Sequence, residues 1–216
     1  MKLRLSWLAL VCLTLAAVPG AAGDLYDNGP INGQVDAWTI DFGFVVSDTF
    51  TLSRSSEVTG LSFGAWLIPG DTLDSVEVSF TSGEFGGTTF FDQQVNLTAG
   101  GCFVNQYGYN VCTETGNFNA NMNAGTYWMN LSNAIVSNGD PVYWDENAGV
   151  DCGGSDGNQH NCPSMPSQNS LGTILSEAFT LNGSNSGTGT TPEPTSLLLF
   201  ASGVVAVAGV VRRKLQ

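Results

Sequence analysis

Apolar and polar residues alternate with a period of two in several short segments of this chain. From 38 to 46, every even position is apolar, and positions 76–81 and 127–132 repeat the pattern with valine, leucine, phenylalanine, tyrosine or methionine on one parity. Successive side chains of a strand point to opposite faces of its sheet. Each segment therefore predicts a strand with one buried face.

Other segments complete an all-β pattern. Val58–Ile68 is predicted as a strand that ends at Pro69-Gly70-Asp71, a type II turn sequence, and Gly86-Gly87 separates two apolar segments as in a hairpin. Phe179 and Leu181 predict a closing strand. Eight to ten short strands, each with one apolar face, need a second layer to cover that face. We expect a single β-sandwich of the jelly-roll type.

The first 23 residues have the three parts of a secretory signal peptide. Lys2 and Arg4 precede an uncharged apolar run, Leu5–Val18, and the small residues 20–23 follow it. The alternative is an uncleaved membrane anchor, but the run is shorter than the roughly 20 residues that cross a bilayer. We expect export with cleavage near Ala22-Gly23.

The C-terminus carries a second targeting pattern. Pro192-Glu193-Pro194 precedes an uncharged segment, 195–211, and the basic triplet Arg212-Arg213-Lys214 follows. As a helix, the segment would span about 25 Å, and the triplet would stay on the cytoplasmic side. A plain stop-transfer anchor is one alternative. A GPI signal is another, although such signals lack a basic stop.

These three parts, in this order, resemble the PEP-CTERM sorting signal of exported bacterial proteins. Thr191 stands where an apolar residue is frequent, which is a minor departure. The resemblance implies a transmembrane helix that holds the precursor in the inner membrane, and an exosortase that cuts near Pro192-Glu193-Pro194. It also implies delivery to the cell surface or to an exopolysaccharide matrix. It covers about 26 residues and does not indicate an activity.

The charge is unevenly distributed. The chain has 19 acidic and six basic residues, but residues 24–191 contain 18 of the acids and a single base, Arg54, which leaves a net charge of −17 there. We place the β-domain at 24–181 and a flexible Gly/Asn/Ser/Thr linker at 182–191. The charge excludes a nucleic-acid partner, because binding phosphates needs a basic face. It also argues against direct adhesion to anionic polysaccharide.

Four cysteines remain after signal cleavage, and an even number in an exported chain predicts two disulfides. Three connectivities are possible. We favour Cys102–Cys112 and Cys152–Cys162, because each bond closes a Gly/Asn-rich loop with little core of its own. A metal site is the alternative, but no Cys-x2-Cys spacing is present.

The sequence offers little catalytic chemistry. His160 is the only histidine, and no Gly-x-Ser-x-Gly elbow accompanies it. Asp145 and Glu146 are adjacent on a predicted strand, so they point to opposite faces and cannot act as a glycosidase pair. We therefore expect a non-enzymatic protein without a cofactor.

Calcium is the one ion that the acidic residues suggest. Asp145, Asp151 and Asp156 lie with Glu146 and Asn158 within 14 residues, and calcium prefers such oxygen ligands. The spacing does not match an EF-hand loop, and a domain this acidic also acquires acidic loops by chance.

Tryptophan faces suit stacking on sugar rings. Trp128 has the parity opposite to its apolar neighbours and is the first candidate for an exposed platform, with Trp144 second; core packing is the alternative for both.

The sequence leaves two hypotheses for the function. The first is a non-enzymatic surface or matrix protein, and the alternative is a carbohydrate-binding module that holds exopolysaccharide.

Overall fold

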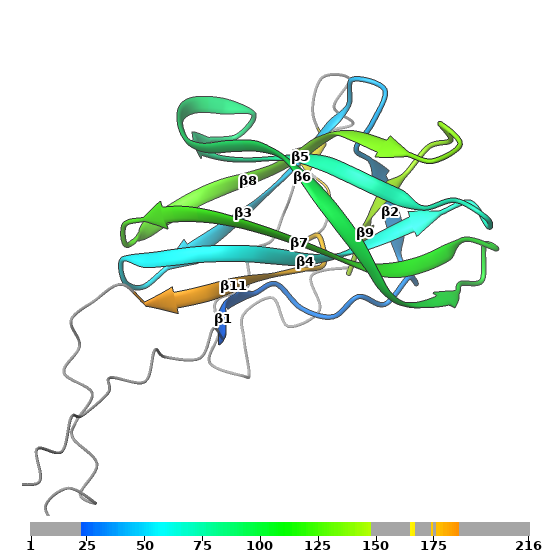
Figure 1. Ribbon diagram of the computed structural model, residues 1–216, viewed down its shortest axis with the longest axis horizontal. Coiled ribbons are helices and arrows are strands. Elements are labelled where there is room, and N and C mark those ends of the chain that lie inside the picture. The colour runs from blue at the N-terminus through cyan, green and yellow to red at the C-terminus, as the bar shows by residue number, and fades with distance from the viewer. Residues whose placement is uncertain (1–22, 148–164, 167–173, 175, 186–216) are drawn as a thin grey trace, which may run out of the picture.

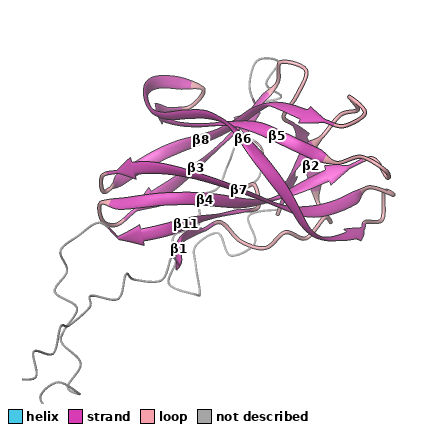
Figure 2. Cartoon of the chain, viewed as in Figure 1, coloured by secondary structure: helices cyan, strands magenta, loops and turns pink. Residues whose placement is uncertain are grey.

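A computed structural model describes residues 23–147, 165–166, 174 and 176–185 of the chain. This part is all-β, as the alternation predicts, and its strands wrap around a common interior (Figures 1 and 2). No helix in the described ranges has the length and apolar character needed to cross a bilayer. Residues 1–22 of the predicted signal peptide and the predicted transmembrane segment lie outside the described residues, whereas Gly23, the last residue of that predicted peptide, begins β1.

The described residues form eleven strands. They are β1 (Gly23–Asp27), β2 (Asp36–Thr39), β3 (Val45–Leu52), β4 (Ser56–Leu67), β5 (Leu73–Gly83), β6 (Gly86–Val104), β7 (Asn110–Met122), β8 (Gly125–Val136), β9 (Tyr143–Glu146), β10 (Met165–Pro166) and β11 (Phe179–Asn185).

All the strand pairs are antiparallel, and the main pairs are nested along the chain. β5 pairs with β6, β4 with β7, β3 with β8, and β1 with β11, so each pair encloses the one before it. Successive pairs alternate between two halves of the sheet, in the orders β1-β11-β4-β7 and β6-β5-β8-β3. This winding of nested pairs is that of a jelly roll.

The two halves are not separate sheets, because β6 belongs to both. Its first part pairs with β5 and its second part with β7, so one curled sheet runs from β1 to β10. The halves pack through aromatic contacts: Phe80 of β5 lies 5.8 Å from Phe118 of β7, and Phe50 of β3 lies 6.1 Å from Tyr26 of β1 (ring centroids). The core is the space that this curl encloses.

The predicted alternation holds closely in β5 and β8. Val76, Val78 and Phe80 are buried, and the residues between them face outward. In β8, Met129 and Leu131 are fully buried on the inner face. Apolar burial of this kind is the main driving force for closing the sheet.

The predicted strand over 38–46 is wrong in its middle. The chain turns between β2 and β3, with a hydrogen bond from Phe44 N to Asp41 O (2.9 Å) and positive φ angles at Phe42 (52°) and Gly43 (86°). Phe42 is 66% exposed instead of buried. The turn lets β2 pair with β9 while β3 joins the other half of the sheet, a choice that alternation alone cannot reveal.

The predicted linker starts too early. Residues 182–185 continue β11 beyond Leu181 and pair with β4 as far as Asn185, opposite Ser56. This pairing uses backbone groups, so a segment of Asn, Gly and Ser can form it without apolar side chains. The described domain therefore extends four residues past the predicted boundary.

The predicted disulfide between Cys102 and Cys112 is present. The two residues are cross-strand partners near the tip of the β6–β7 hairpin. Cys152 and Cys162, the other predicted pair, lie outside the described residues.

Gly64 in β4 provides a test of how tightly β9 packs on the sheet. A Cβ atom at this position would lie 2.6 Å from the Cβ of Asp145 and 2.8 Å from Cγ2 of Ile31. We expect Gly64→Ala to lower the free energy of unfolding by about 1–3 kcal/mol, because both neighbours must shift. Gly101→Ala is the control, since nothing lies within 4 Å of its added Cβ. Equal denaturant midpoints for the two variants would contradict this packing.

Candidate functional site

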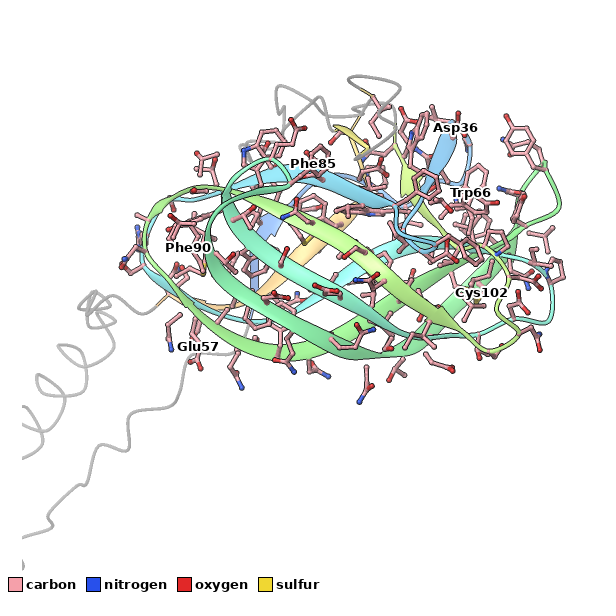
Figure 3. All side chains as sticks on the ribbon, turned by 90° about the horizontal axis from the view of Figure 1, so that it is seen from above. Asp36, Glu57, Trp66, Phe85, Phe90 and Cys102 are labelled. Carbon is pink, nitrogen blue, oxygen red and sulfur yellow. A yellow bond between two sulfur atoms is a disulfide. The ribbon has the colours of Figure 1, made fainter. Side chains whose placement is uncertain are left out.

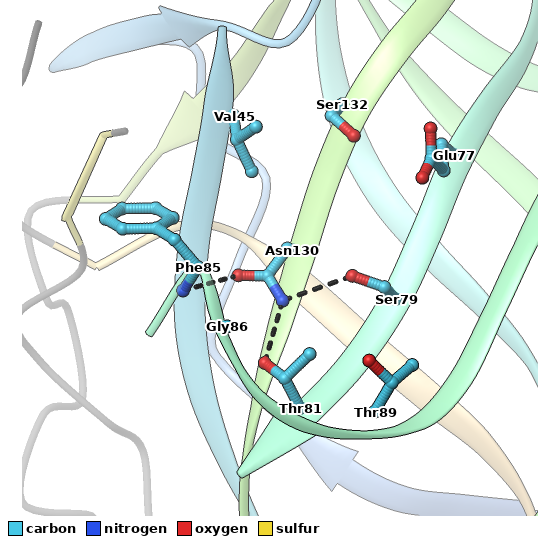
Figure 4. Close-up of a pocket in the computed structure, with 9 residues that line it drawn as sticks. All are labelled: Val45, Glu77, Ser79, Thr81, Phe85, Gly86, Thr89, Asn130 and Ser132. Atoms are coloured by element: carbon cyan, nitrogen blue, oxygen red, sulfur yellow. Dashed lines mark hydrogen bonds between the residues drawn. The ribbon is translucent and has the colours of Figure 1, made fainter. Parts of the chain in front are cut away.

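The outer face of the β5–β8 half carries a groove of about 380 Å³, a size typical of small-ligand sites. Strands β3, β5 and β8 form its floor, and the β5–β6 hairpin forms one wall (Figure 4). Most of the lining side chains are uncharged and polar. The uncharged polar residues are Ser79, Thr81, Thr89, Asn130 and Ser132. The other lining residues are Val45, Glu77, Phe85 and Gly86.

Asn130 organises the groove. Its Nδ2 donates to Ser79 Oγ (3.2 Å) and to Thr81 Oγ1 (3.0 Å), and its Oδ1 accepts from Phe85 N (3.3 Å), as Figure 4 shows. Asn130 is buried although it lies on the outward row of β8. These bonds tie the floor of the groove to its hairpin wall, which fixes the shape of the site before any ligand arrives.

Phe85 stands at the rim of the groove. It has a φ of 53°, an angle that a bulky residue seldom adopts, and its ring is 38% exposed. Backbone strain of this kind occurs often at ligand-binding sites, which makes Phe85 a candidate contact for a ligand. The sequence predicts this hairpin at Gly86-Gly87, but the turn itself lies at Glu84-Phe85, because Gly83 pairs with Gly86.

Trp128 lies where its parity predicts, on the outward face of β8. It is half-buried, and it stands directly opposite Thr81 of the groove floor and two residues from Asn130. Same-face neighbours at this separation are within reach of a large side chain. Trp128 therefore borders the groove.

The prediction for Trp144 is wrong. Its side chain is fully buried, its Nε1 donates to the carbonyl of Ala178 (3.1 Å), and its ring packs against Phe63 and Phe179. The reason is that β9 pairs with both β2 and β4, which turns this face of β9 toward the core. Trp144 cannot reach a sugar.

A second exposed aromatic surface, which sequence reasoning missed, lies at the tip of the β6–β7 hairpin. Tyr107 is 58% exposed and stacks on the buried Trp66, with ring centroids 5.7 Å apart. Asn105 Oδ1 accepts hydrogen bonds from the backbone nitrogens of Tyr107 and Tyr109, which fixes the loop. The 21 uncharged residues from Gln93 to Thr113 are the sequence signal that could have found it.

The groove and the Tyr107 surface are formed by different residues, because neither Tyr107 nor Trp66 belongs to the groove lining. Figure 3 shows Phe90 toward one end of the domain, Trp66 and Cys102 toward the other, and Phe85 between them. They are therefore two independent surfaces.

Asp145, a predicted calcium ligand, is buried on the outer side of β9. Its carboxylate accepts hydrogen bonds from Trp66 Nε1, Asn32 N and Gly33 N. Burial raises the pKa of Asp145 to about 6 despite the opposing effect of these donors. The bonds give Asp145 a structural role, because they attach the 32–33 loop to the sheet.

The structure does not test the other predicted chemistry. Asp151, Asp156 and His160 lie outside the described residues. Within the described ranges, no group of three or more His, Cys, Asp or Glu side chains is arranged to hold a metal ion.

Two further carboxyl groups are buried without hydrogen-bond partners. Burial raises the pKa of Glu114, on the inner face of β7, to about 7. Burial first, and then the charge of Asp48, raises the pKa of Glu177 well above its ordinary value. Neither residue was singled out by the sequence, because nothing local marks a buried acid.

The comparison with protein families concerns the C-terminus. Residues 190–214 match the family model of the PEP-CTERM protein-sorting motif, a range that includes Pro192-Glu193-Pro194 and Arg212-Arg213-Lys214. The predicted motif is thereby confirmed. This is an exported protein that an exosortase sorts and processes from a membrane-anchored precursor. No curated protein and no solved structure is significantly similar to the chain.

Glu114 provides a test of the buried charge. Its folded-state pKa of about 7 exceeds its ordinary value of 4.5, so the folded state binds the proton more tightly than the unfolded state does. Its contribution to stability is complete below about pH 4.5 and is lost as the pH rises through 7. We expect Glu114→Gln to be more stable than the wild type at pH 8, with this advantage shrinking toward pH 4.5.

Thermal melts of both proteins between pH 4 and 8 measure this difference. Asp74→Asn, an exposed change on β5, is the control and should melt in parallel with the wild type. A difference between Glu114→Gln and the wild type that does not vary with pH would show that Glu114 does not ionise in this range.

Proposed function

We propose that this protein is a non-enzymatic component of the bacterial surface or matrix, whose β-domain binds uncharged exopolysaccharide in the groove on β3, β5 and β8. The sorting motif supports the proposed localisation, since it implies export and processing by an exosortase. The groove supports the binding function. Its combination of hydroxyl and amide groups with one aromatic ring is the observation that carries the proposal.

The lining of the groove fits a sugar better than it fits other ligands. Hydroxyl and amide groups both donate and accept hydrogen bonds, as sugar hydroxyls do. The ring of Phe85 and the neighbouring Trp128 offer apolar faces for the C–H face of a pyranose. Val45, on the β3 part of the floor, is apolar as well.

The negative charge of the domain favours uncharged polysaccharides over anionic ones. Glu77 lies in the groove, and Asp92 lies close to Glu77. Burial raises the pKa of Asp92, and the negative charge of Glu77 raises it further. A uronate or sulfate group would meet these acids and the overall negative charge of the domain. The ligand is therefore an uncharged polymer.

Phe85→Ala tests the groove. Affinity electrophoresis in gels that contain the exopolysaccharide of the producing strain, dextran or alginate measures the retardation of the purified protein. We expect retardation by an uncharged polymer and none by alginate, with at least about a tenfold loss of affinity in Phe85→Ala. Trp128→Ala should weaken binding in the same gels.

Phe90→Ala is the matched control. Phe90 lies on β6, five residues after Phe85, and is 48% exposed, but it packs edge-on against Tyr127 outside the groove lining. Tyr107→Ala separates the two aromatic surfaces. If Tyr107→Ala abolishes retardation and Phe85→Ala does not, the hairpin tip is the binding surface and the groove proposal fails.

Removal of residues 192–216 tests the sorting function. We expect the shortened chain to be exported and recovered in the soluble fraction, because both the cleavage motif and the apolar anchor are missing. Fractionation of the producing cells, with immunodetection of the domain, measures the distribution. A shortened chain that still sediments with the envelope would contradict this role of the tail.

A further inference from the structure

Two glutamates face each other in the interior, at the junction of β9 and the segment before β11. Glu146 and Glu177 are directly opposed in an antiparallel bridge, so their side chains leave the same face. Glu177 is fully buried and Glu146 is 4% exposed. The same face carries Trp144 and Phe179, whose rings pack together at 5.7 Å. A directly opposed pair of like charges is destabilising even at a surface.

The neighbouring carboxylates have donors, but Glu177 does not. Glu146 Oε2 accepts from Trp38 Nε1 (3.0 Å). Asp48 Oδ2 accepts from Asn28 Nδ2 (2.8 Å), Ser176 Oγ (3.0 Å) and Glu177 N (3.0 Å). Both carboxylate oxygens of Glu177 lack a hydrogen-bond partner. A buried ion without a partner costs several kcal/mol, so something must balance it.

No Lys or Arg side chain of residues 24–191 supplies this balance. Arg54 is the single Lys or Arg between residues 24 and 191. It immediately precedes β4, whereas β9 pairs with β4 only at Ala65 and Trp66, near the far end of that strand. At about 3.3 Å per residue, Arg54 is roughly 30 Å or more from the glutamate pair along the strand.

We propose that Glu146 and Glu177 bind a calcium ion that joins β9 to the closing strand β11. The donors are carboxylate oxygens, which favour a hard cation. Calcium also accepts amide, hydroxyl and carbonyl oxygens. Beside the pair, Asn28 is hydrogen-bonded to the backbone carbonyl of Glu177 and to Ser176 and Asn147, the chain neighbours of the two glutamates. Magnesium retains several waters and fits a closed, dry site poorly.

This site shares Glu146 with the calcium loop that the sequence suggests, but none of its other residues. Asp145 and Glu146 lie on opposite faces of β9, and the carboxylate of Asp145 accepts hydrogen bonds from two backbone nitrogens and an indole nitrogen. Glu177 is distant in sequence from the predicted acidic residues. The inference is also independent of polysaccharide binding, because the groove lies on the outer face of other strands.

The test uses the exported full chain, purified in detergent. EDTA removes bound metal ions, and the thermal melt is recorded at pH 8, where few carboxyl groups are protonated. Calcium at about 100 times its Kd should raise the melting midpoint by about 5–10 °C, and the midpoint should continue to rise with the logarithm of the calcium concentration. Magnesium at the same concentrations should raise it much less. Isothermal titration of the stripped protein should give one calcium per chain.

Glu177→Gln keeps the shape of the side chain and removes its charge. We expect this variant to lose the calcium response and to melt above the stripped wild type. Glu57→Gln, which removes an acid from β4 opposite Ser184 of the same closing strand, should keep the full response. Glu146→Gln gives a second reading if Glu177→Gln fails to fold, and it should also lose the response.

An unchanged midpoint with calcium would overturn the proposal, as would an equal calcium shift in the wild type and Glu177→Gln. Protonation of Glu177 is the competing explanation. If the wild type gains stability only as the pH falls, and Glu177→Gln does not, a proton neutralises Glu177 and no cation site exists.

Discussion

The structure depends on the pairing of β6 with two partners. This 19-residue strand pairs with β5 in its first part and with β7 in its second, and so it carries the backbone hydrogen bonds from one half of the sheet into the other. The curl that results brings Phe80 against Phe118 and encloses the core. The two exposed surfaces follow from the same strand, since the groove wall lies at its start and the disulfide and Tyr107 loop lie at its end.

A second constraint is the scarcity of positive charge. With Arg54 as the single base in residues 24–191, the buried acids must be balanced by hydrogen bonds, protons or ions from solution. Asp145 and Asp48 obtain backbone, indole, amide and hydroxyl donors. Glu114 and Glu177 obtain none, and only Glu177 has a second glutamate, Glu146, directly opposite it, so we place an external cation there.

The sequence predicted the class of fold well, because a strand with one buried face leaves a period-two pattern. The patterns at 76–81 and 127–132 gave the right inner and outer faces, and the outer faces are the groove floor. The pattern at 38–46 failed because a turn at Asp41–Phe44 sends β2 and β3 to different partners. Trp144 failed for a related reason, since its exposure depends on which strands flank β9. Glu177 could not be found at all, because its burial depends on contacts with strands far away along the chain.

The sequence alone determined the export and sorting of the protein and its all-β class. Sorting signals are linear segments that the export machinery reads as sequence, so the Pro-Glu-Pro motif and the basic triplet carry their meaning without a fold. Local alternation likewise reports burial of one face, whatever covers it. The tertiary structure decided which outward residues form a groove, which tryptophan is buried and where two glutamates meet. Those outcomes depend on pairing between segments that are distant in sequence, and no local pattern specifies that pairing.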